Sequence, residues 1–349
     1  MEGFAHDFLP GRVVFGAGSL DQVAGEVEGL GVRRALVIAT RSARDAADVV
    51  EIALGNSFAG RIDGVTQHVP TELADQARAK AREVDADGII AIGGGSAIGL
   101  AKAIALTNAV MIVAVPTTYS GSEMTPVWGE TAGGGKATGR DLRVLPRVVV
   151  YDAVLSQGLP LGVTAASVAN AVAHCVEAVW TPRADSITET FAVEGLRKLT
   201  AGLQSVLVAP TDLEARGELL YGACLAGVAL AAAGTGLHHK LCHLLGGTYN
   251  LPHAETHAAV LPQVARVNAP AVPEAKRRLE EALQTDDLAG RLFELFEAAG
   301  VPTSLRALGL TEQQAVEAAQ KFEPTDNPVP VTVELTTEIL TRAWAGTRP

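Results

Sequence analysis

Aromatic residues, cysteine and long apolar runs are all scarce in this sequence. Phe, Trp and Tyr make up 4% of its 349 residues, whereas Ala, Gly, Val and Leu are abundant, a composition typical of closely packed helices and a buried parallel sheet. Three cysteines, Cys175, Cys224 and Cys242, are odd in number and lie in apolar stretches, which argues against a disulfide framework and favours a reducing cytoplasm. No apolar run reaches transmembrane length and the N-terminus lacks a signal-peptide pattern, so we expect no membrane partner.

Positive charge is also in short supply. With 28 Lys and Arg against 39 Asp and Glu, the formal net charge is −11, which argues against nucleic acid and anionic membranes as partners. An anionic ligand would therefore need a local basic pocket. The length allows two domains, each large enough to bury a core of its own.

Short strands alternate with helices in the first part of the chain. Apolar runs rich in β-branched residues predict strands at 8–16, 33–40, 88–93, 110–116 and 147–152, with a helix at 71–84. Such strands are buried on both faces, so they predict a parallel α/β sheet with crossover helices. After Pro160 long Ala- and Leu-rich helices are predicted at 164–181, 186–208, 212–233, 272–284 and 311–322. We therefore divide the chain into an α/β domain, 1–157, and an all-α domain, 158–349.

Four histidines of the second domain form the most informative pattern. His239 and His243 are four apart and share one face of a helix, and His253 and His257 repeat this spacing. Between the pairs, G-G-T-Y-N-L-P ends the first helix, and a second helix is predicted to begin near Pro252. Two such pairs of imidazoles predict either a metal site or a proton-transfer site.

Another helix carries Asn170 and His174, again four apart, in S-V-A-N-A-V-A-H-C-V-E-A. Divalent metals in mixed sites usually have an anionic carboxylate among neutral imidazoles. Position 170, where an aspartate would serve, holds a neutral amide, which weakens the metal interpretation without excluding it. Cys242, next to His243, is interpreted as a small core thiol rather than a nucleophile, because no motif that would orient a base accompanies it.

A glycine-rich segment, A-I-G-G-G-S-A-I-G, follows the predicted strand at 88–93 and opens a helix. Gly94 and Gly95 would let the backbone approach a phosphate, and the helix N-terminus supplies free N–H groups and a favourable dipole. Ser96 adds a hydroxyl and is the expected N-cap, with the helix beginning at about Ala97. The segment departs from the usual G-x-G-x-x-G fingerprint, so it predicts a pyrophosphate site without identifying the nucleotide.

Two further segments lie at the carboxyl ends of predicted strands, where open α/β sheets bind ligands. P-T-T-Y-S-G-S-E-M-T follows the strand at 110–116 and offers the hydroxyls of Thr117, Thr118 and Ser122. Thr40 ends the strand at 33–40 and is expected near the adenosine ribose. An aspartate there would favour a free 2′-hydroxyl, so the threonine leaves both NADH and NADPH open as the cofactor.

Taken in order, these motifs resemble the iron-containing alcohol dehydrogenase superfamily, which also includes glycerol dehydrogenases and, more distantly, dehydroquinate synthases. The resemblance covers nearly the whole chain and is strongest to the maleylacetate reductase branch. Metal-using members carry G-G-G-S-x-x-D, but Gly99 stands at the Asp position, and their T-T-x-G-T-G-S-E loop is one residue longer than T-T-Y-S-G-S-E. Their four metal ligands would fall on Asn170, His174, His239 and His253, so the single carboxylate of that set is missing.

The resemblance implies a Rossmann-like α/β domain followed by an all-α domain, the fold of dehydroquinate synthase and the iron-containing alcohol dehydrogenases. It implies reduction of the C=C bond of maleylacetate to 3-oxoadipate in aromatic-compound degradation. The cofactor would be NADH or NADPH, with no metal required, and the enzyme would be a cytoplasmic homodimer acting on a small dicarboxylate. The alternatives are a metal-dependent alcohol or glycerol dehydrogenase and, from another class, a lyase of the dehydroquinate synthase type.

This function assigns roles to the residues named above. We expect His243, and after it His253, to donate the proton that completes the reduction. The residues expected to contact the substrate are Asn170, His174, His239, Lys240 and His257, with Lys136, Arg140 and Arg143 as further candidates for its carboxylates. The residues expected to bind the cofactor are Thr40, Gly94, Gly95, Ser96, Thr117, Thr118, Ser122 and Lys136.

Overall fold

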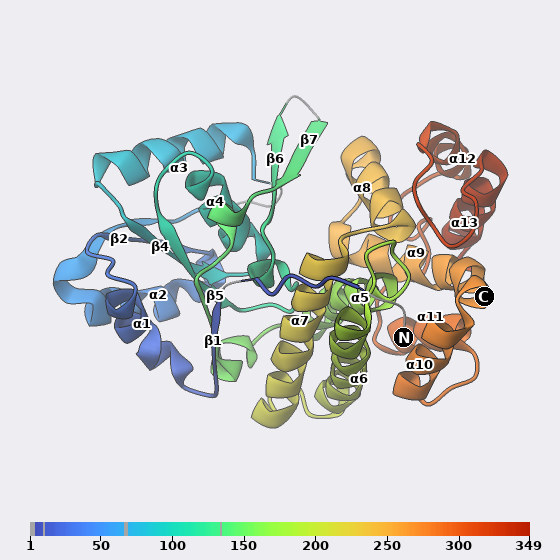
Figure 1. Ribbon diagram of the computed structural model, residues 1–349, viewed down its shortest axis with the longest axis horizontal. Coiled ribbons are helices and arrows are strands. Elements are labelled where there is room, and N and C mark those ends of the chain that lie inside the picture. Colours follow the sequence, from blue (N-terminus) through green and yellow to red (C-terminus); the bar gives the residue numbers. More distant parts are fainter. Residues whose placement is uncertain (1–3, 10, 66–68, 133–134) are drawn as a thin grey trace. The chain divides into compact units, whose positions relative to one another are not determined.

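The computed structural model describes residues 4–9, 11–65, 69–132 and 135–349, without the side chains of 132, 135 and 136. The chain forms two compact units (Figure 1). One, the α/β unit, contains Leu9–Leu159 and Thr211–Leu220. The other, the helical unit, contains Pro160–Pro210 and Tyr221–Pro349, together with the N-terminal segment that ends at Phe8.

The α/β unit is built on a six-stranded sheet in the order β1-β8-β5-β4-β2-β3, and every neighbouring pair is parallel. The strands are β1 (Arg12–Phe15), β2 (Ala35–Ala39), β3 (Phe58–Ile62), β4 (Gly88–Gly93), β5 (Met111–Pro116) and β8 (Val148–Tyr151). Five of them fall on the predicted apolar runs. The sequence did not predict β3, because an edge strand that is only half-buried, F-A-G-R-I, has no continuous apolar run.

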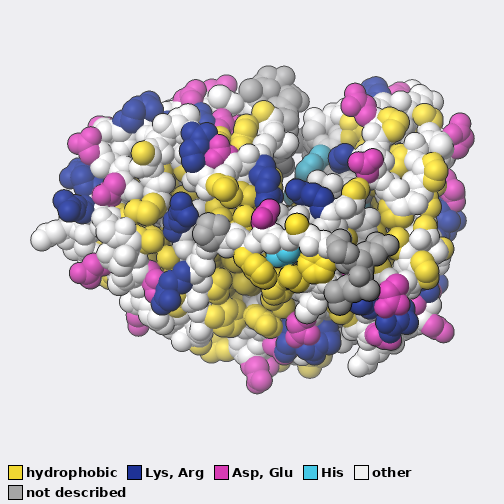
Figure 2. Space-filling view, in the orientation of Figure 1, with side chains coloured by type: hydrophobic (Ala, Val, Ile, Leu, Met, Phe, Trp, Pro, Cys, Tyr) yellow, Lys and Arg dark blue, Asp and Glu magenta, His cyan; other side chains and the backbone are white. Residues whose placement is uncertain are grey.

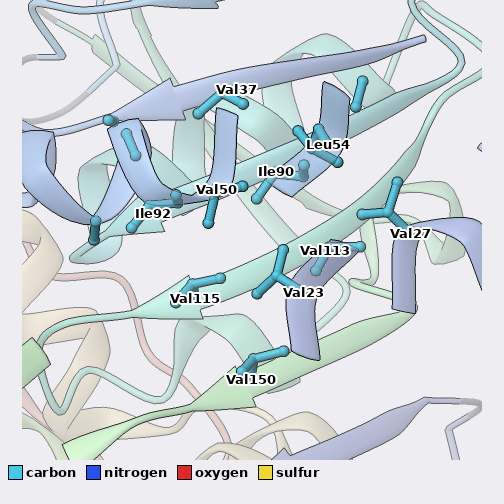
Figure 3. Close-up of a cluster of buried hydrophobic side chains, with 14 of the residues drawn as sticks. Val23, Val27, Val37, Val50, Leu54, Ile90, Ile92, Val113, Val115 and Val150 are labelled. Carbon is cyan, nitrogen blue, oxygen red and sulfur yellow. The ribbon is translucent and has the colours of Figure 1, made fainter. Parts of the chain in front are cut away.

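Helices cover the sheet because its strands bury both faces. The helices are α1 (Val23–Gly29), α2 (Arg44–Leu54), α3 (Thr71–Glu83) and α4 (Gly95–Ala105). Helices α1 and α2 pack on the face formed by alternate strand residues, and α4 packs against β4 and β5. Figure 3 shows the α1 and α2 side of this core, where Val23, Val27, Val50 and Leu54 of the helices pack against Val37, Ile90, Ile92, Val113, Val115 and Val150 of the strands.

The strand order places a switch point between β2 and β4. From β2 the chain continues to its neighbour β3 at one edge of the sheet, then returns to β4, β5 and β8 on the other side of β2. At this point the carboxyl ends of β2 and β4 are adjacent, and Thr40 N–H donates to the carbonyl of Ile92 at 3.2 Å. Open α/β sheets bind their ligands in the crevice at such a point.

A separate antiparallel hairpin, β6 (Val127–Ala132) and β7 (Gly135–Arg140), follows the loop after β5. The sequence did not predict these strands, because their polar and glycine-rich residues lack an apolar alternation. A Cβ at Gly139 would lie 2.8 Å from the Trp128 ring, so glycine leaves room for the indole of the partner strand.

The helical unit confirms the predicted all-α character of the second part of the chain. Its helices are α5 (Leu161–Ala178), α6 (Ser186–Val208), α7 (Leu213–Ala233), α8 (Leu237–Tyr249), α9 (His253–Asn268), α10 (Pro273–Leu283), α11 (Leu288–Ala298), α12 (Glu312–Lys321) and α13 (Val333–Ala345). The first residues of α7 cluster with the α/β unit. By length and composition α5 and α7 could cross a membrane, but 83% and 72% of their apolar windows are buried inside the fold, as in core helices.

Three of these helices form the scaffold of the predicted histidine site. Helix α5 packs against α9, and α8 packs against both α9 and α5. The predicted break in G-G-T-Y-N-L-P falls at its second half: α8 continues through G-G-T-Y to Tyr249, and Asn250 then turns the chain in a left-handed conformation. As predicted, α9 begins directly after Pro252.

Candidate active site

The glycine-rich loop joins β4 to α4 at the carboxyl edge of the sheet. Gly93 has a φ of +148°, and a Cβ there would lie 2.6 Å from Thr40 Cγ2. A Cβ at Gly94 would lie 2.9 Å from Thr118 Cγ2. Glycine is therefore required where three neighbouring strands end. Gly95, the first residue of α4, is exposed, so a phosphate could approach its backbone N–H at the helix N-terminus.

The expected cap of this helix was wrong. Gly94 is the N-cap, with extended backbone angles, and α4 begins at Gly95, so Ser96 already lies in the first turn. The physical reason is that glycine at 94 lets the chain turn directly beneath Thr118, which starts the helix two residues earlier than expected. The hydroxyl of Ser96 remains at the helix N-terminus but does not cap it.

The loop after β5 is held by a buried lysine that the sequence pattern did not single out. Thr117 N–H donates to Gly93 O at 3.1 Å, which ties this loop to the glycine loop. Lys102 of α4 donates from Nζ to the carbonyls of Ser122 at 2.7 Å and Thr125 at 2.8 Å. Burial lowers the pKa of Lys102 to about 7, although the charge of nearby Glu123 opposes this shift. The available signal was a single lysine inside the apolar helix G-L-A-K-A-I-A.

The basic residues predicted to bind the substrate carboxylates differ in their surroundings. Lys136 belongs to β7, but its side chain lies outside the described part of the chain. Arg143 is exposed and forms a salt bridge with Asp141 at 2.6 Å, so its charge is already paired. Lys240 is exposed on α8 and hydrogen-bonds to Thr325 Oγ1.

The histidines of α5, α8 and α9 meet in one cluster, as the spacing predicted. His239 Nε2 lies 2.7 Å from His174 Nδ1, and their rings stack with centroids 4.7 Å apart. His243 and His253 also stack, with centroids 5.7 Å apart and planes inclined by 18°. His257 Nε2 lies 3.3 Å from His253 Nε2. The side chains that the sequence treats as separate pairs therefore form a connected set.

Burial divides this cluster in two. His174, His239 and His257 are buried, as is Asn170, whereas His243 and His253 are only half-buried. On the face shown in Figure 2, histidine occupies only small areas of the surface. The structure therefore leaves one stacked pair partly accessible and encloses the rest.

His238 is a further member of the cluster that the sequence pattern did not single out. Its Nε2 lies 2.7 Å from His257 Nδ1, and both rings are fully buried. Burial, together with the neighbouring imidazole of His239, lowers the pKa of His238 to about 3; burial and His253 lower the pKa of His257 well below its ordinary value. Both rings are therefore neutral near pH 7.

Cys242 lies 3.8 Å from His238 Nε2. Burial, reinforced by the charge of Glu177, raises the pKa of the Cys242 thiol well above its ordinary value. A thiol that does not ionise is a poor nucleophile, which favours its interpretation as a core residue.

Glu177 is the second missed member, and it supplies a buried negative charge. Its Oε2 lies 2.5 Å from His239 Nδ1 and accepts from Gly236 N–H at 2.8 Å, while Oε1 accepts from His238 N–H at 2.6 Å. Burial by itself would raise the pKa of Glu177, but His239 and these hydrogen bonds outweigh it and lower the pKa to about 2. The available signal was its place three residues after His174, on the same helix face.

The metal-binding positions of the superfamily carry no carboxylate in this chain. Those positions are Asn170, His174, His239 and His253. Asn170 brings no charge, and both ring nitrogens of His239 are within hydrogen-bond distance of protein atoms. Among the residues that the structure describes, three potential ligands with atoms within 4.8 Å of one another are His238, Cys242 and His257, none of them at those positions. Within this group, His238 Nε2 and His257 Nδ1 lie at a hydrogen-bond distance of 2.7 Å.

Comparison with known proteins gives the same assignment along the whole chain. Residues 10–153 match the sequence model of the iron-containing alcohol dehydrogenases, and 164–344 match that of the C-terminal part of the Fe-containing alcohol dehydrogenase family. A maleylacetate reductase of Pseudomonas sp. (strain P51) is 45% identical over 348 residues, 99% of each chain.

Two solved structures are similar over 100% of both chains. They are a putative alcohol dehydrogenase from Ralstonia eutropha JMP134, with a TM-score of 0.97 and 47% identity, and the maleylacetate reductase from Rhizobium sp. strain MTP-10005, with a TM-score of 0.96 and 40% identity. The chain therefore belongs to the iron-containing alcohol dehydrogenase family, in its maleylacetate reductase branch.

Proposed function

We propose that this protein reduces the C=C bond of maleylacetate to 3-oxoadipate, with NADH or NADPH as the reductant. Full-length similarity to maleylacetate reductases supports this activity and makes the protein an oxidoreductase. The observation that carries the proposal is the histidine cluster. A partly accessible stacked pair adjoins buried imidazoles, and the neutral Asn170 stands where metal-using members have a carboxylate.

The chemistry of maleylacetate suits such a site. The substrate is a dicarboxylate whose C=C bond is conjugated to a ketone, and the bound nicotinamide supplies a hydride to the β carbon of this system. The resulting negative charge spreads over an enolate, which takes a proton at the α carbon. Hydrogen-bond donors can stabilise the charge of an enolate and one general acid can protonate it. An alkoxide formed directly from a ketone carries a more localised charge, so a Lewis acid stabilises it more. We therefore propose that the reaction requires no metal.

His243 is the proposed proton donor, with His253 as the second candidate. Both are half-buried, so a substrate can reach them, and their stacking keeps the two rings together. His257 is fully buried and contacts His253, which revises the expectation that it touches the substrate. We propose instead that His257 orients His253.

The substrate-binding assignment keeps Asn170 and His174, whereas His239, whose two ring nitrogens lie against Glu177 and His174, is proposed to orient His174. The Oδ1 atom of Asn170 is buried and has no hydrogen-bond partner among the described atoms, as expected for a group that pairs with a ligand. Lys240 is proposed to attract a substrate carboxylate, because it is an exposed cation on the same helix as His239 and His243.

The α/β unit is proposed to bind the cofactor. The N-terminus of α4 at the exposed Gly95 fits a pyrophosphate, and glycines at 93 and 94 let Thr40 and Thr118 pack against this loop. The residues proposed to contact the cofactor are Thr40, Gly94, Gly95, Ser96, Thr117, Thr118, Ser122 and Lys136. The division into a dinucleotide-binding domain, 1–157, and a helical catalytic domain, 158–349, belongs to the same proposal. We also propose that the protein is a cytoplasmic homodimer that acts in aromatic-compound degradation and has no nucleic-acid or membrane partner.

Loss of nicotinamide absorbance tests this function directly. The purified protein is mixed with NADH or NADPH and maleylacetate, with and without a chelator. Rapid oxidation of the cofactor that yields 3-oxoadipate and persists in the chelator is the expected result. Oxidation only with simple aldehydes or ketones, and only after metal is restored, would instead identify a metal-dependent alcohol dehydrogenase. Turnover of a phosphorylated sugar acid without net oxidation of the cofactor would identify a lyase.

A further inference from the structure

The carboxylate of Glu177 does two things at once, and the first is to cap α8. The N-cap residue of this helix, Gly236, has no capping side chain, and Glu177 of α5 accepts its N–H and that of His238 instead. A Cβ at Gly236 would lie 3.1 Å from Glu177 Oε1, so glycine lets the carboxylate come this close. A negative charge at a helix N-terminus is favourable, and it fixes the start of α8 against α5.

The second role of the Glu177 carboxylate is to determine which ring nitrogen of His239 and His174 carries the hydrogen atom. An ionised carboxylate can only accept, so His239 carries a hydrogen on Nδ1, and whenever this ring is neutral its Nε2 is an acceptor. Since His239 Nε2 lies 2.7 Å from His174 Nδ1, His174 donates from Nδ1, and its own Nε2 becomes an acceptor. One buried carboxylate thereby determines the tautomers of two histidines on two helices.

We propose that Glu177 is a positioning residue for the reduction. By fixing the tautomer of His239 and, through it, that of His174, it determines whether His174 offers the substrate a hydrogen-bond acceptor or a donor. This inference rests on the proposed function, because it takes His174 as a substrate contact. Carboxylates that orient metal-bound histidines change affinity or activity by about 10- to 100-fold when they are removed, and we expect an effect of similar size for Glu177.

Two substitutions separate this role from simple packing. Glu177→Gln has nearly the same shape but no charge. Its amide can donate to His239 Nδ1, so His239 is no longer held in the tautomer that carries its hydrogen on Nδ1. Glu177→Asp retains the charge with a shorter side chain. We expect Glu177→Gln to lower kcat about 10- to 100-fold with maleylacetate, and Glu177→Asp to recover part of the loss. The affinity for NADH should remain unchanged in both, because the proposed cofactor site belongs to the α/β unit.

Asp185 provides a matched control in the same unit. It caps α6 by accepting from Thr188 N–H at 2.7 Å, and it lies 2.8 Å from His6 Nδ1, so it too is a buried helix-capping carboxylate paired with a histidine. It is not part of the histidine cluster. Asp185→Asn should therefore lower the melting temperature without changing kcat or KM.

The decisive readout is the ¹⁵N spectrum of the imidazoles, measured beside the kinetics. The wild-type enzyme should show His239 with its hydrogen on Nδ1, and Glu177→Gln should show a mixture of tautomers together with the lower kcat. The inference is overturned if Glu177→Gln keeps wild-type kcat and KM and loses only stability, as Asp185→Asn does, because Glu177 would then be a helix cap alone. If the wild-type enzyme does not reduce maleylacetate, the proposed function fails. The spectra then decide separately whether Glu177 sets the tautomers, and an unchanged His239 signal in Glu177→Gln overturns that part.

Discussion

Replacing Gly95 with alanine should weaken cofactor binding without weakening the fold. A Cβ at this position meets only Ser120 Oγ, at 3.6 Å, which is an ordinary contact. Gly95 lies in the first turn of α4, where alanine is more favourable than glycine by roughly 0.5–1 kcal/mol. The added methyl group nevertheless stands on the exposed end of the helix, where a pyrophosphate needs bare backbone.

Two other glycines serve as controls with different expected outcomes. A Cβ at Gly94 would lie 2.9 and 3.0 Å from Thr118 Cγ2 and Oγ1, so Gly94→Ala should destabilise the fold by about 1–3 kcal/mol through overpacking. At Gly158 an added Cβ would meet no atom within 4 Å, so Gly158→Ala should change neither stability nor binding.

The assay combines thermal unfolding with a fluorescence titration of NADH. For Gly95→Ala we expect a melting temperature equal to or above that of the wild type and a Kd raised about tenfold or more, equivalent to roughly 1.4 kcal/mol of binding free energy. A Kd within twofold of the wild type, at unchanged stability, would refute the reasoning and move the pyrophosphate away from this helix.

Three further outcomes are expected. His243→Ala should lower kcat by roughly two to four orders of magnitude with little change in NADH affinity. His253→Ala is assayed in parallel, and the variant whose pH–rate profile loses a limb identifies the proton donor. Near-normal kcat in both variants would contradict protonation of the enolate by either histidine. Activity should survive EDTA, whereas Asn170→Asp should create measurable Zn²⁺ affinity in a calorimetric titration; loss of activity in EDTA that iron or zinc restores would contradict the metal-free proposal. Acid should destabilise the fold, because burial lowers the pKa of His238 to about 3 and also lowers the pKa of His257, so the unfolded chain binds these protons more readily. Each ring should then remove about 1.4 kcal/mol of unfolding free energy per pH unit below about pH 6.5, measured by urea unfolding, and His257→Asn should show a shallower dependence.

The sequence by itself determined the elements that depend on local pattern. Strands such as 88–93 and 110–116 were predictable because a strand buried on both faces must be apolar throughout. The pairs His239/His243 and His253/His257 were predictable because a helix places residues four apart on one face. The glycine loop was predictable because only bare backbone admits a phosphate.

The start of α4 and the charge of the histidine cluster depend on contacts between residues far apart in the sequence, so only the tertiary structure decided them. Ser96 lost its expected capping role because Thr118, from the loop after β5, lies over Gly94, and the helix begins two residues earlier than expected. The negative charge of the histidine cluster comes from Glu177 rather than from position 170, and it reaches His239 across 62 residues of sequence. Spacing along a helix shows which side chains share a face, but only the packing of α5, α8 and α9 determines which imidazoles are enclosed, which remain accessible, and where each one carries its hydrogen.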